Sequence, residues 1–380
     1  MSYLRDDREQ WHKFCKQMFV MTKLIFYPLN NADCCLVKLN GGKTILYDYA
    51  NTGSEEACDL PEWLKADLDG KEEIDVVAFS HSDQDHVKGA KDFFYMEWAT
   101  KYQSDDRIKI KELWVPADMI TERHPYEDES ARVLREEARY RLKQGTGVKV
   151  FSRPGRLEDW LKANGLTVES RASCIVNAGN IINTFNLASD GIEIFAHAPF
   201  SMMDGEEVID KNTNSLVHHL RIEEGLTTFD VLMCADAVQS TLDGIVTQTK
   251  KYRNEDRLAW DIMKVAHHCS SKSLNDTEKG QDETEPSENI KWLLEQAKDK
   301  AVQVMTCKRI PDEDTDQPPH KQAHKTYVNT STQVGGEILV TMDKHLKRTV
   351  IELDECGYVI KRNELGAAAI LTSTAAPKVG

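Results

Sequence analysis

The sequence predicts an α+β fold, a sandwich of two β-sheets flanked by helices with an extra C-terminal hairpin. Short apolar runs typical of strands occur in two sets, one in each half of the chain. Patterns with helical spacing lie between and after these runs. Three of the runs lead directly into His and Asp residues, and loops at strand ends are where functional groups usually gather.

The bulk composition is that of a globular protein. The chain has 380 residues, enough for one large domain or two ordinary ones. Hydrophobic residues make up 40% and charged residues 29%, within the usual globular range. The net charge of −15 disfavours a broad, salt-driven grip on nucleic-acid duplexes, but a bound metal can still create a local positive site.

Cysteine usage and the termini indicate a compartment. The nine cysteines are odd in number and form no CxxC pair, which favours reduced thiols over a disulfide framework. No apolar stretch approaches the roughly 18 to 20 residues that cross a bilayer. The first 22 residues resemble no secretory signal and are expected to be an N-terminal extension. We therefore expect a cytoplasmic protein that does not interact with membranes.

The first half of the chain predicts alternating strands and helices. Residues 24–50 predict two or three short strands joined by Asn-Ala-Asp and Asn-Gly-Gly turns. The run EIDVVAFS predicts a buried strand that ends at His81. The other elements expected in this half are a helix at 86–102, a strand at 111–117, a helix at 127–145 and a short helix at 157–165.

The second half repeats this pattern. A helix is expected before residue 260 and an amphipathic segment at 288–298. Residues 274–287 predict a mobile loop, and the small-residue tail from 365 predicts disorder. His320 and His324 are interpreted as surface residues. The strands expected in this half lie at 191–200, 214–222, 229–237, 260–273 and 301–307, followed by the terminal hairpin.

Ionisable residues follow three of the predicted strands. If these strand ends share one edge, three histidines and three carboxylates converge there, which is the set of ligands that a metal site needs. Because carboxylates replace some of the imidazoles, manganese or magnesium would fit as well as zinc. Solvent or a hydrogen-bond network are the alternatives for balancing these charges. The residues are His81, Asp83, Asp85 and His86, then Asp236, then His267 and His268.

These motifs resemble a known family. The segment His81-Ser-Asp-Gln-Asp-His86 resembles the His-x-His/Asp-x-Asp-His signature of the metallo-β-lactamase fold. The version with Asp in third place is similar to the DNA-uptake competence nucleases of the ComEC type. Matching segments follow in the same order, among them TILYDYANTG, NTNSLVHHLRI, FDVLMCADA and DIMKVAHHCSSKS. The resemblance spans residues 23–310, with a helical insertion at about 90–180, and implies an αββα sandwich.

The resemblance implies a dinuclear site holding two divalent metal ions, Zn or Mn. Site one would use His81 and Asp83, and site two would use Asp85, His86 and His267, with Asp236 bridging both. Asp85 would also orient the attacking water. His268 would donate a proton or contact substrate, although it is also an alternative to His267 as the ligand. Asp33, Asp48 and Asn212 would support the ligands from behind.

The chain departs from the family pattern at three places. Where the wider fold usually supplies a histidine to site one, this chain has Asn212-Thr-Asn-Ser215, so an asparagine oxygen is an alternative ligand. Cys234 and Cys269 replace residues of the family motifs. Both are either metal contacts or simply small buried residues.

The chemistry that this site implies is metal-dependent hydrolysis. Two divalent ions carry four positive charges, and three ligand aspartates return three, which leaves about +1 to attract an anion. We expect a phosphodiesterase or nuclease acting on single-stranded nucleic acid or a nucleotide. Alternatives are hydrolysis of another ester, lactone or thioester, or a non-catalytic module that binds metal within a larger system of partner proteins. Residues 311–364 are expected to form a C-terminal strand extension, and residues 365–380 a flexible tail.

Overall fold

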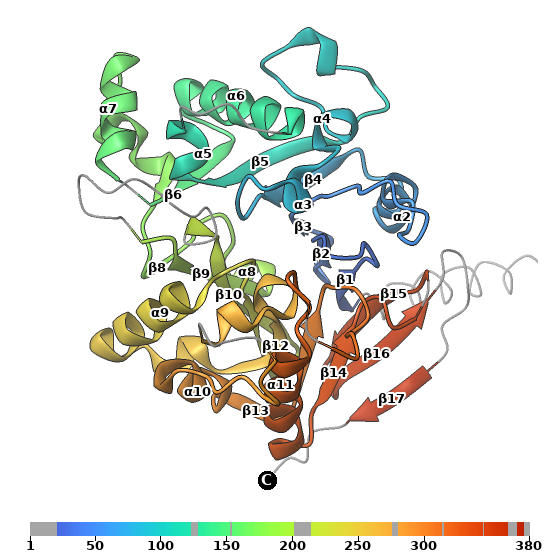
Figure 1. The fold of residues 1–380 in the computed structure, drawn as a ribbon. Helices are drawn as coiled ribbons and strands as arrows, with labels where there is room; N and C mark the ends of the chain where they lie inside the picture. Colours follow the sequence, from blue (N-terminus) through green and yellow to red (C-terminus); the bar gives the residue numbers. More distant parts are fainter. Residues whose placement is uncertain are drawn as a thin grey trace, which may run out of the picture.

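The computed structural model describes residues 21–122, 128–152, 154–200, 214–275, 280–313, 315–344, 346–363 and 371–375. Within these residues the strands form two sheets, one of ten strands and one of seven. Figure 1 shows helices gathered on the outer side of each sheet. The predicted α+β sandwich with a C-terminal hairpin is confirmed.

The ten-stranded sheet is antiparallel at one side and parallel at the other. Strands β3 to β7 run parallel to one another, so their carboxyl ends point to one edge. In spatial order the strands are β17 (Leu371–Ala375), β16 (Gly357–Asn363), β15 (Arg348–Asp354), β1 (Thr22–Phe26), β2 (Cys35–Lys38), β3 (Thr44–Tyr47), β4 (Glu73–Ala78), β5 (Lys109–Pro116), β6 (Val148–Phe151) and β7 (Ile175–Val176).

The seven-stranded sheet has the same mixed character. Strands β11 to β14 are parallel, so they also present their carboxyl ends together. In spatial order the strands are β14 (Glu337–Val340), β13 (Ala297–Met305), β12 (Trp260–Lys264), β11 (Thr227–Met233), β10 (Val217–Glu224), β9 (Ile192–Ala198) and β8 (Asn180–Ile181).

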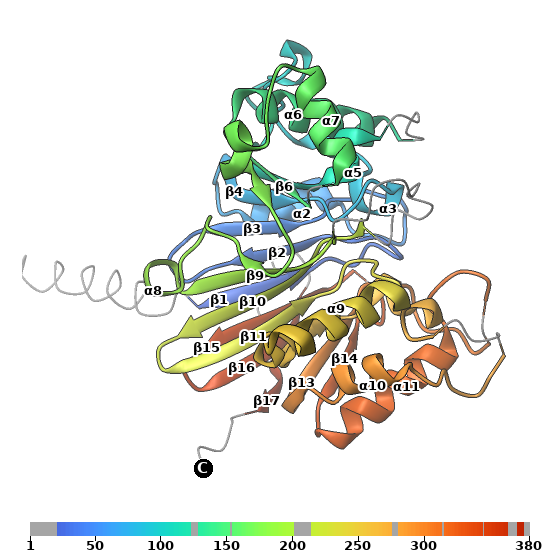
Figure 2. The same cartoon turned by 90° about the vertical axis from the view of Figure 1, so that its left-hand side faces the viewer.

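Helices cover the outer faces, which gives four layers and three apolar cores (Figures 1 and 2). The core between the sheets contains Phe26, Trp114 and Ile262. The outer face of the ten-stranded sheet is covered by α2 (Leu60–Asp67), α3 (Gln84–Val87), α4 (Ala90–Phe93), α5 (Ala117–Thr121), α6 (Glu129–Gln144) and α7 (Gly155–Ala163). The seven-stranded sheet is covered by α9 (Gln239–Tyr252), α10 (Glu288–Leu294) and α11 (Lys321–Gln333).

Local sequence explains the two ends of α6 and the break between α3 and α4. Helix α6 begins where the Asp128 side chain accepts a hydrogen bond from the Ser130 N–H, and it ends at Gly145, whose φ is +79°. The single helix predicted at 86–102 is wrong. Gly89 has a φ of +80°, and a Cβ there would lie 3.2 Å from the Asn51 Cβ, so the chain turns and forms α3 and α4 separately.

The C-terminal segment is integrated into both sheets. The hairpin predicted from residues 335–343 and 349–362 is formed by the second segment alone, as β15 and β16, and β15 pairs with β1. Strand β14 extends the other sheet beside β13, and α11, which the sequence patterns did not predict, packs against both of these strands. The segment 90–180, predicted as a helical insertion, also contributes β5 to β7 to the first sheet. The boundaries placed at 22, 310 and 364 stay predictions.

Parts of the sequence predictions lie outside the described residues. These include residues 1–20 and most of the tail, of which the structure describes β17. Among the described residues, no helix combines the length and the apolar composition that crossing a membrane requires.

Candidate metal centre

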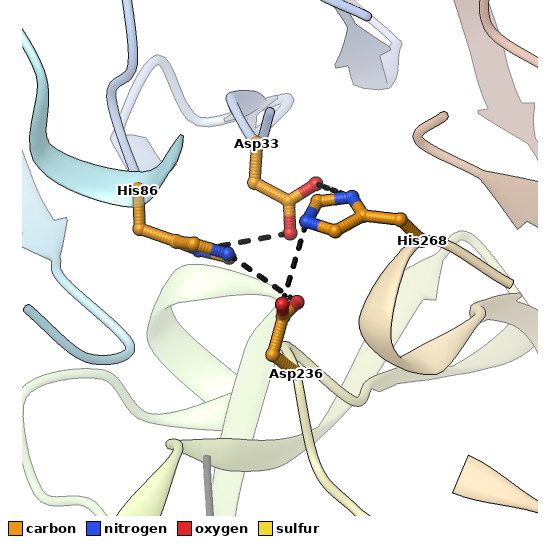
Figure 3. Close-up of side chains that lie close together, drawn as sticks. All are labelled: Asp33, His86, Asp236 and His268. Atoms are coloured by element: carbon orange, nitrogen blue, oxygen red, sulfur yellow. Dashed lines mark ion pairs between the residues drawn. The ribbon is translucent and has the colours of Figure 1, made fainter. Parts of the chain in front are cut away.

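The parallel halves of the two sheets bring their strand ends to one place. Asp48 follows β3, and the segment His81–His86 follows β4. From the other sheet, Asp236 follows β11 and His268 follows β12. Asp33 comes from the turn between β1 and β2. The convergence expected from sequence is therefore present for these residues, as Figure 3 shows for four of them.

His86 is held with a defined ring orientation. Its Nδ1 lies 2.9 Å from Oδ2 of Asp48, and its Nε2 lies 3.3 Å from Oδ1 of Asp236. A carboxylate on Nδ1 fixes the proton there and leaves Nε2 as the nitrogen able to bind a cation. Asp48 is itself oriented by Ser80, which donates its backbone N–H at 2.7 Å and its hydroxyl at 2.8 Å.

His268 has the same kind of orientation, supplied by a backbone carbonyl. Its Nδ1 donates to the Thr306 oxygen at 2.7 Å, and its Nε2 lies 3.3 Å from Oδ2 of Asp236 and 3.4 Å from Oδ2 of Asp85. His267 lies further out: its side chain is 20% exposed, and its Nε2 is 3.8 Å from Asp236. His268, and not His267, therefore lies in the groups of side chains suited to metal binding.

The backbone of this turn explains why the sequence left the two histidines unresolved. His267, His268 and Cys269 have φ values of 49°, 51° and 66°, a conformation that costs free energy for residues other than glycine. A strand period predicts that neighbouring side chains point to opposite faces. These left-handed residues break that period, so the position of each ring depends on the contacts that hold the turn.

His320 holds this turn from outside the strand. Its ring Nδ1 accepts a hydrogen bond from the Ser271 backbone N–H at 2.9 Å, and the backbone N–H of His320 donates to the Cys269 carbonyl at 3.1 Å. His320 is buried with 3% of its surface exposed, so its interpretation as a surface residue is wrong. No local sequence pattern indicates this role, because His320 lies in a loop that only the fold brings to the turn.

Asp236 lies between the two histidines. Its Oδ1 faces His86 and its Oδ2 faces His268, both at 3.3 Å. Burial alone would raise the pKa of this carboxyl, but the neighbouring His268 and His86 outweigh burial and hold the pKa well below its usual range. The same pairing acts on His268: burial lowers its pKa, yet Asp236 and Asp33 raise it to about 10. Both histidines thus hold positive charge beside the carboxylates.

Lys264 is a buried cation that the sequence analysis missed. It ends β12, its ammonium forms an ion pair with Asp33, and it donates to the Ala235 carbonyl at 3.0 Å. It also lies 3.6 Å from Oδ1 of Asp236. Burial lowers the pKa of Lys264, but the neighbouring Asp33 and Asp236 raise it by more, so the net pKa is above its ordinary value and the ammonium stays charged. The sequence feature that could have indicated this buried cation is a lysine within the otherwise largely apolar run DIMKVA.

Asp33 lies on the Nδ1 side of both rings. Its oxygens are 3.8 Å from Nδ1 of His86 and 3.8 Å from Nδ1 of His268. Both Nδ1 atoms already have partners, in Asp48 and the Thr306 carbonyl. Asp33 therefore contacts the edge of each ring that does not bind a cation.

His81 and the two aspartates after it complete the rim. His81 is buried beside His86, with ring centroids 3.9 Å apart. Asp83 occupies the N-cap position of α3, and its side chain is 38% exposed and lies 3.7 Å from Nε2 of His81. Asp85 is 40% exposed and reaches His268. Asn212 lies outside the described residues.

The donor atoms fit a bound cation. Among the described residues two groups each present one ligand atom per side chain within 4.8 Å of one another: Asp33, His86, Asp236 and His268, and His81, Asp85 and His86. Several of these buried atoms form no hydrogen bond among the described residues, namely Nε2 of His81, His86 and His268, Oδ1 of Asp236 and both carboxylate oxygens of Asp33. Buried polar atoms without hydrogen bonds are rare. Divalent cations at the two groups would satisfy the imidazole nitrogens and Asp236.

The two cysteines of the motifs are not in these groups. Neither Cys234 nor Cys269 belongs to a described cluster of potential ligands. Burial raises the pKa of the Cys234 thiol to about 12. Both cysteines are buried in the core, as small apolar residues often are.

Comparison with solved structures gives neighbours of low similarity. The chain resembles Tm1679, a metal-dependent hydrolase of the β-lactamase superfamily, with a TM-score of 0.37 and 10% identity over 84% of this chain and 95% of that one. It also resembles the class B3 di-zinc metallo-β-lactamase LRA-12 from an Alaskan soil metagenome, with a TM-score of 0.32 and 12% identity over 83% and 90%. A third neighbour is the metallo-β-lactamase GOB-18 from Elizabethkingia meningoseptica, with a TM-score of 0.30 and 13% identity over 83% and 88%.

No protein-family model matches the chain, and no curated protein matches it. At such TM-scores the structural neighbours identify neither a family nor a substrate for this chain.

Proposed function

We propose that this chain is a metal-dependent hydrolase that uses two divalent ions, and that its substrate is a phosphodiester. The observation that carries this proposal is the convergence of imidazole nitrogens and a carboxylate oxygen that form no hydrogen bond at the ends of β4, β11 and β12. Their ion-pair contacts are 3.3 to 3.7 Å long, beyond the usual hydrogen-bond distance, and bound cations would satisfy these buried atoms better. The resemblance of the His81–His86 segment to the metallo-β-lactamase signature points to the same chemistry.

We assign ligands from the geometry. His86, His268 and Asp236 present Nε2, Nε2 and a carboxylate toward one position. His81 groups with Asp85 and His86 at a second, and Asp83 borders it 3.7 Å from His81. Asp85 reaches His268 from the exposed side and would orient the attacking water and accept its proton. We assign Asp33 and Asp48 to support, because they contact Nδ1 edges and Lys264. His267 would contact substrate at the rim.

Charge favours an anionic substrate. Bound divalent ions supply Lewis acidity, which stabilises charge that develops on the oxygens of the reacting group. Asp236, Asp83 and Asp85 leave about +1 against two such ions. The charge of Asp33 is cancelled by Lys264, and the further negative charge of Asp48 lies at the Nδ1 edge of His86, away from the Nε2 side. A phosphodiester anion is therefore attracted to the site, whereas a neutral lactone or thioester gains less from it.

A metal and substrate panel tests the proposal. Protein purified without chelator and dialysed against Zn²⁺ or Mn²⁺ should hold close to two equivalents by elemental analysis. It should hydrolyse bis(p-nitrophenyl) phosphate, and chelator should abolish the reaction. If the fully metallated protein opens lactones or thioesters but cleaves no diester, it is a lactonase or thioesterase and not a phosphodiesterase. A protein with no hydrolytic activity at all would favour a metal-binding module.

A further inference from the structure

A hollow lies beside the metal centre, on the side of the loop that follows β13. Its volume is about 420 Å³, and it is lined by Asn30, Glu56, Lys308, Arg309 and Met342. A volume of this size holds a group as large as a nucleotide phosphate with its sugar. Two of the five lining side chains are cations.

Residues that line the hollow are close in sequence to residues of the metal centre. Lys308 is two residues from Thr306, whose carbonyl orients His268, and Asn30 is three residues from Asp33. Consecutive Cα atoms are about 3.8 Å apart, so the Cα of Lys308 lies at most about 8 Å from that of Thr306, and the Cα of Asn30 at most about 11 Å from that of Asp33. The two walls are joined, because the Lys308 N–H donates to Oδ1 of Asn31 at 3.0 Å.

The two cations are available to a ligand. Neither Lys308 nor Arg309 forms an ion pair with any residue that the structure describes, and both are exposed. Arg309 uses Nε to donate to the Met342 carbonyl at 3.2 Å, which fixes the base of its guanidinium. A guanidinium carries five N–H groups, so the Nη groups can still face the hollow. In a chain of net charge −15, such a pair beside the metal centre is conspicuous.

We propose that Lys308 and Arg309 form an anion subsite for a phosphate next to the scissile one, so that the substrate is a nucleic-acid strand and not an isolated diester. This inference rests on the proposed function. Proteins bind single strands through a positively charged groove that follows the backbone, so a second phosphate would enter the hollow when the first lies at the metal centre. Arginine binds phosphate through paired hydrogen bonds, and lysine adds a point charge.

Glu56 gives the subsite an opposing charge. Its carboxylate lines the same hollow, and its backbone N–H donates to Oγ of Ser54 at 3.2 Å, which holds the turn in place. Like charges repel across such a short space. Replacing Glu56 by glutamine should therefore strengthen binding of a strand, whereas replacing the two cations should weaken it.

Binding is measured first, in the metal-loaded Asp85→Asn protein with its metal content verified, using fluorescent oligothymidylate over a series of salt concentrations. Each phosphate contact on a single strand contributes about 0.7 to the slope of log K against log salt. Lys308→Gln with Arg309→Gln should reduce that slope by about 1.4 and weaken binding at least about tenfold. Glu56→Gln should change affinity in the opposite direction. Lys162→Gln, which replaces an exposed lysine on α7 outside the lining of the hollow, is the control for loss of a surface charge.

Kinetics in the wild-type background separate this inference from the proposed function. The ratio of kcat/KM for oligothymidylate to that for bis(p-nitrophenyl) phosphate should fall at least about tenfold in the double variant. An unchanged ratio, or a salt slope equal to that of Lys162→Gln, overturns the subsite while diester hydrolysis still supports the proposed function. Absence of diester hydrolysis refutes the proposed function. Strand binding that depends on Lys308 and Arg309 would then still support the subsite.

Discussion

Nδ1 of His268 lies 2.7 Å from the carbonyl oxygen of Thr306, at the end of the neighbouring strand β13. That hydrogen bond turns Nε2 of the ring toward Asp236. Thr306 also begins the segment that carries Lys308 and Arg309. The Thr306 carbonyl therefore orients the ring of the candidate ligand His268 and lies at the start of the segment that forms the proposed anion subsite. The two adjacent histidines differ in their distance from Asp236, so the choice between them as metal ligand can be tested.

Replacing His268 should cost more metal than replacing His267. His268→Ala removes a buried Nε2 that faces Asp236, whereas His267→Ala removes a ring that is 20% exposed and 3.8 Å away. We expect His268→Ala to lose at least one metal equivalent after dialysis and His267→Ala to keep both, measured by elemental analysis. Equal loss in the two variants would show that both rings bind metal.

Metal binding should release protons at neutral pH. The carboxylates around His86 and His268 raise the pKa of both rings, that of His268 to about 10. Ligation requires neutral imidazole, so up to about two protons must leave at pH 7. Calorimetry in two buffers of different ionisation enthalpy measures this number. In His268→Ala the release should fall by about one proton; an unchanged release would mean that another group gives up the proton.

Chelator-treated protein should lose stability as the pH rises. The folded pKa of His268, about 10, lies above its ordinary value of 6.5. The protonated ring therefore stabilises the fold fully below pH 6.5, and this contribution is lost as the pH approaches 10. The urea midpoint of the wild type should fall between pH 6.5 and 9.5, and that of His268→Gln should fall less. A parallel decline in both proteins would assign the effect to other groups.

Asp85→Asn should lower diester hydrolysis by at least about 100-fold, the usual contribution of a positioned base. Its side chain is 40% exposed, so stability should change little. Asparagine keeps one ligand oxygen, so metal content should stay higher than in Asp85→Ala. Manganese should support the wild-type rate at least as well as zinc, because several of the assigned ligands are carboxylates. A variant that keeps both its metal and its rate would remove Asp85 from the reaction.

His320 should matter for metal affinity as well as for stability. In His320→Ala the buried Ser271 N–H loses its acceptor, which costs about 1 to 3 kcal/mol, and the strained turn at His267 to Cys269 is released. We expect a lower melting temperature and weaker zinc binding, measured by chelator competition. His320→Asn, which offers an acceptor oxygen, should restore part of both.

The control for this prediction is His324→Ala, one helical turn further along α11, with less effect on either property. A fall in melting temperature with unchanged zinc affinity would leave His320 a structural role only.

The sequence predicted the strand ends but not how the groups at those ends pair. His81, His86 and Asp236 were found because each follows a continuous apolar run that predicts a buried strand. The choice of His268 over His267 depends on left-handed backbone angles that no pattern encodes. The helix expected at 86–102 was wrong because one glycine in its pattern has a positive φ.

Partners distant in the chain were equally inaccessible to the sequence analysis. Lys264 meets Asp33 across 231 positions, and only the packing of the two sheets makes that contact.

Lys264 and Asp33 form a buried pair whose removal should reveal whether Asp33 itself binds metal. Lys264→Met leaves the Asp33 carboxylate buried without its cation, which should destabilise the protein by about 3 to 5 kcal/mol. Adding Asp33→Asn removes that charge, so the double variant should be more stable than the sum of the single changes predicts. Urea unfolding of the four proteins gives the coupling energy. Additive effects would mean that the pair is not coupled.

Metal affinity of the same proteins decides the role of Asp33. The carboxylate contacts the Nδ1 edges of His86 and His268, which are already occupied by Asp48 and the Thr306 carbonyl. If Asp33 only balances Lys264, the double variant should bind zinc within about tenfold of the wild type, because the Nε2 atoms and Asp236 are unchanged. If Asp33 is a direct ligand, Asp33→Asn should weaken zinc binding by far more than that, whether Lys264 is present or not.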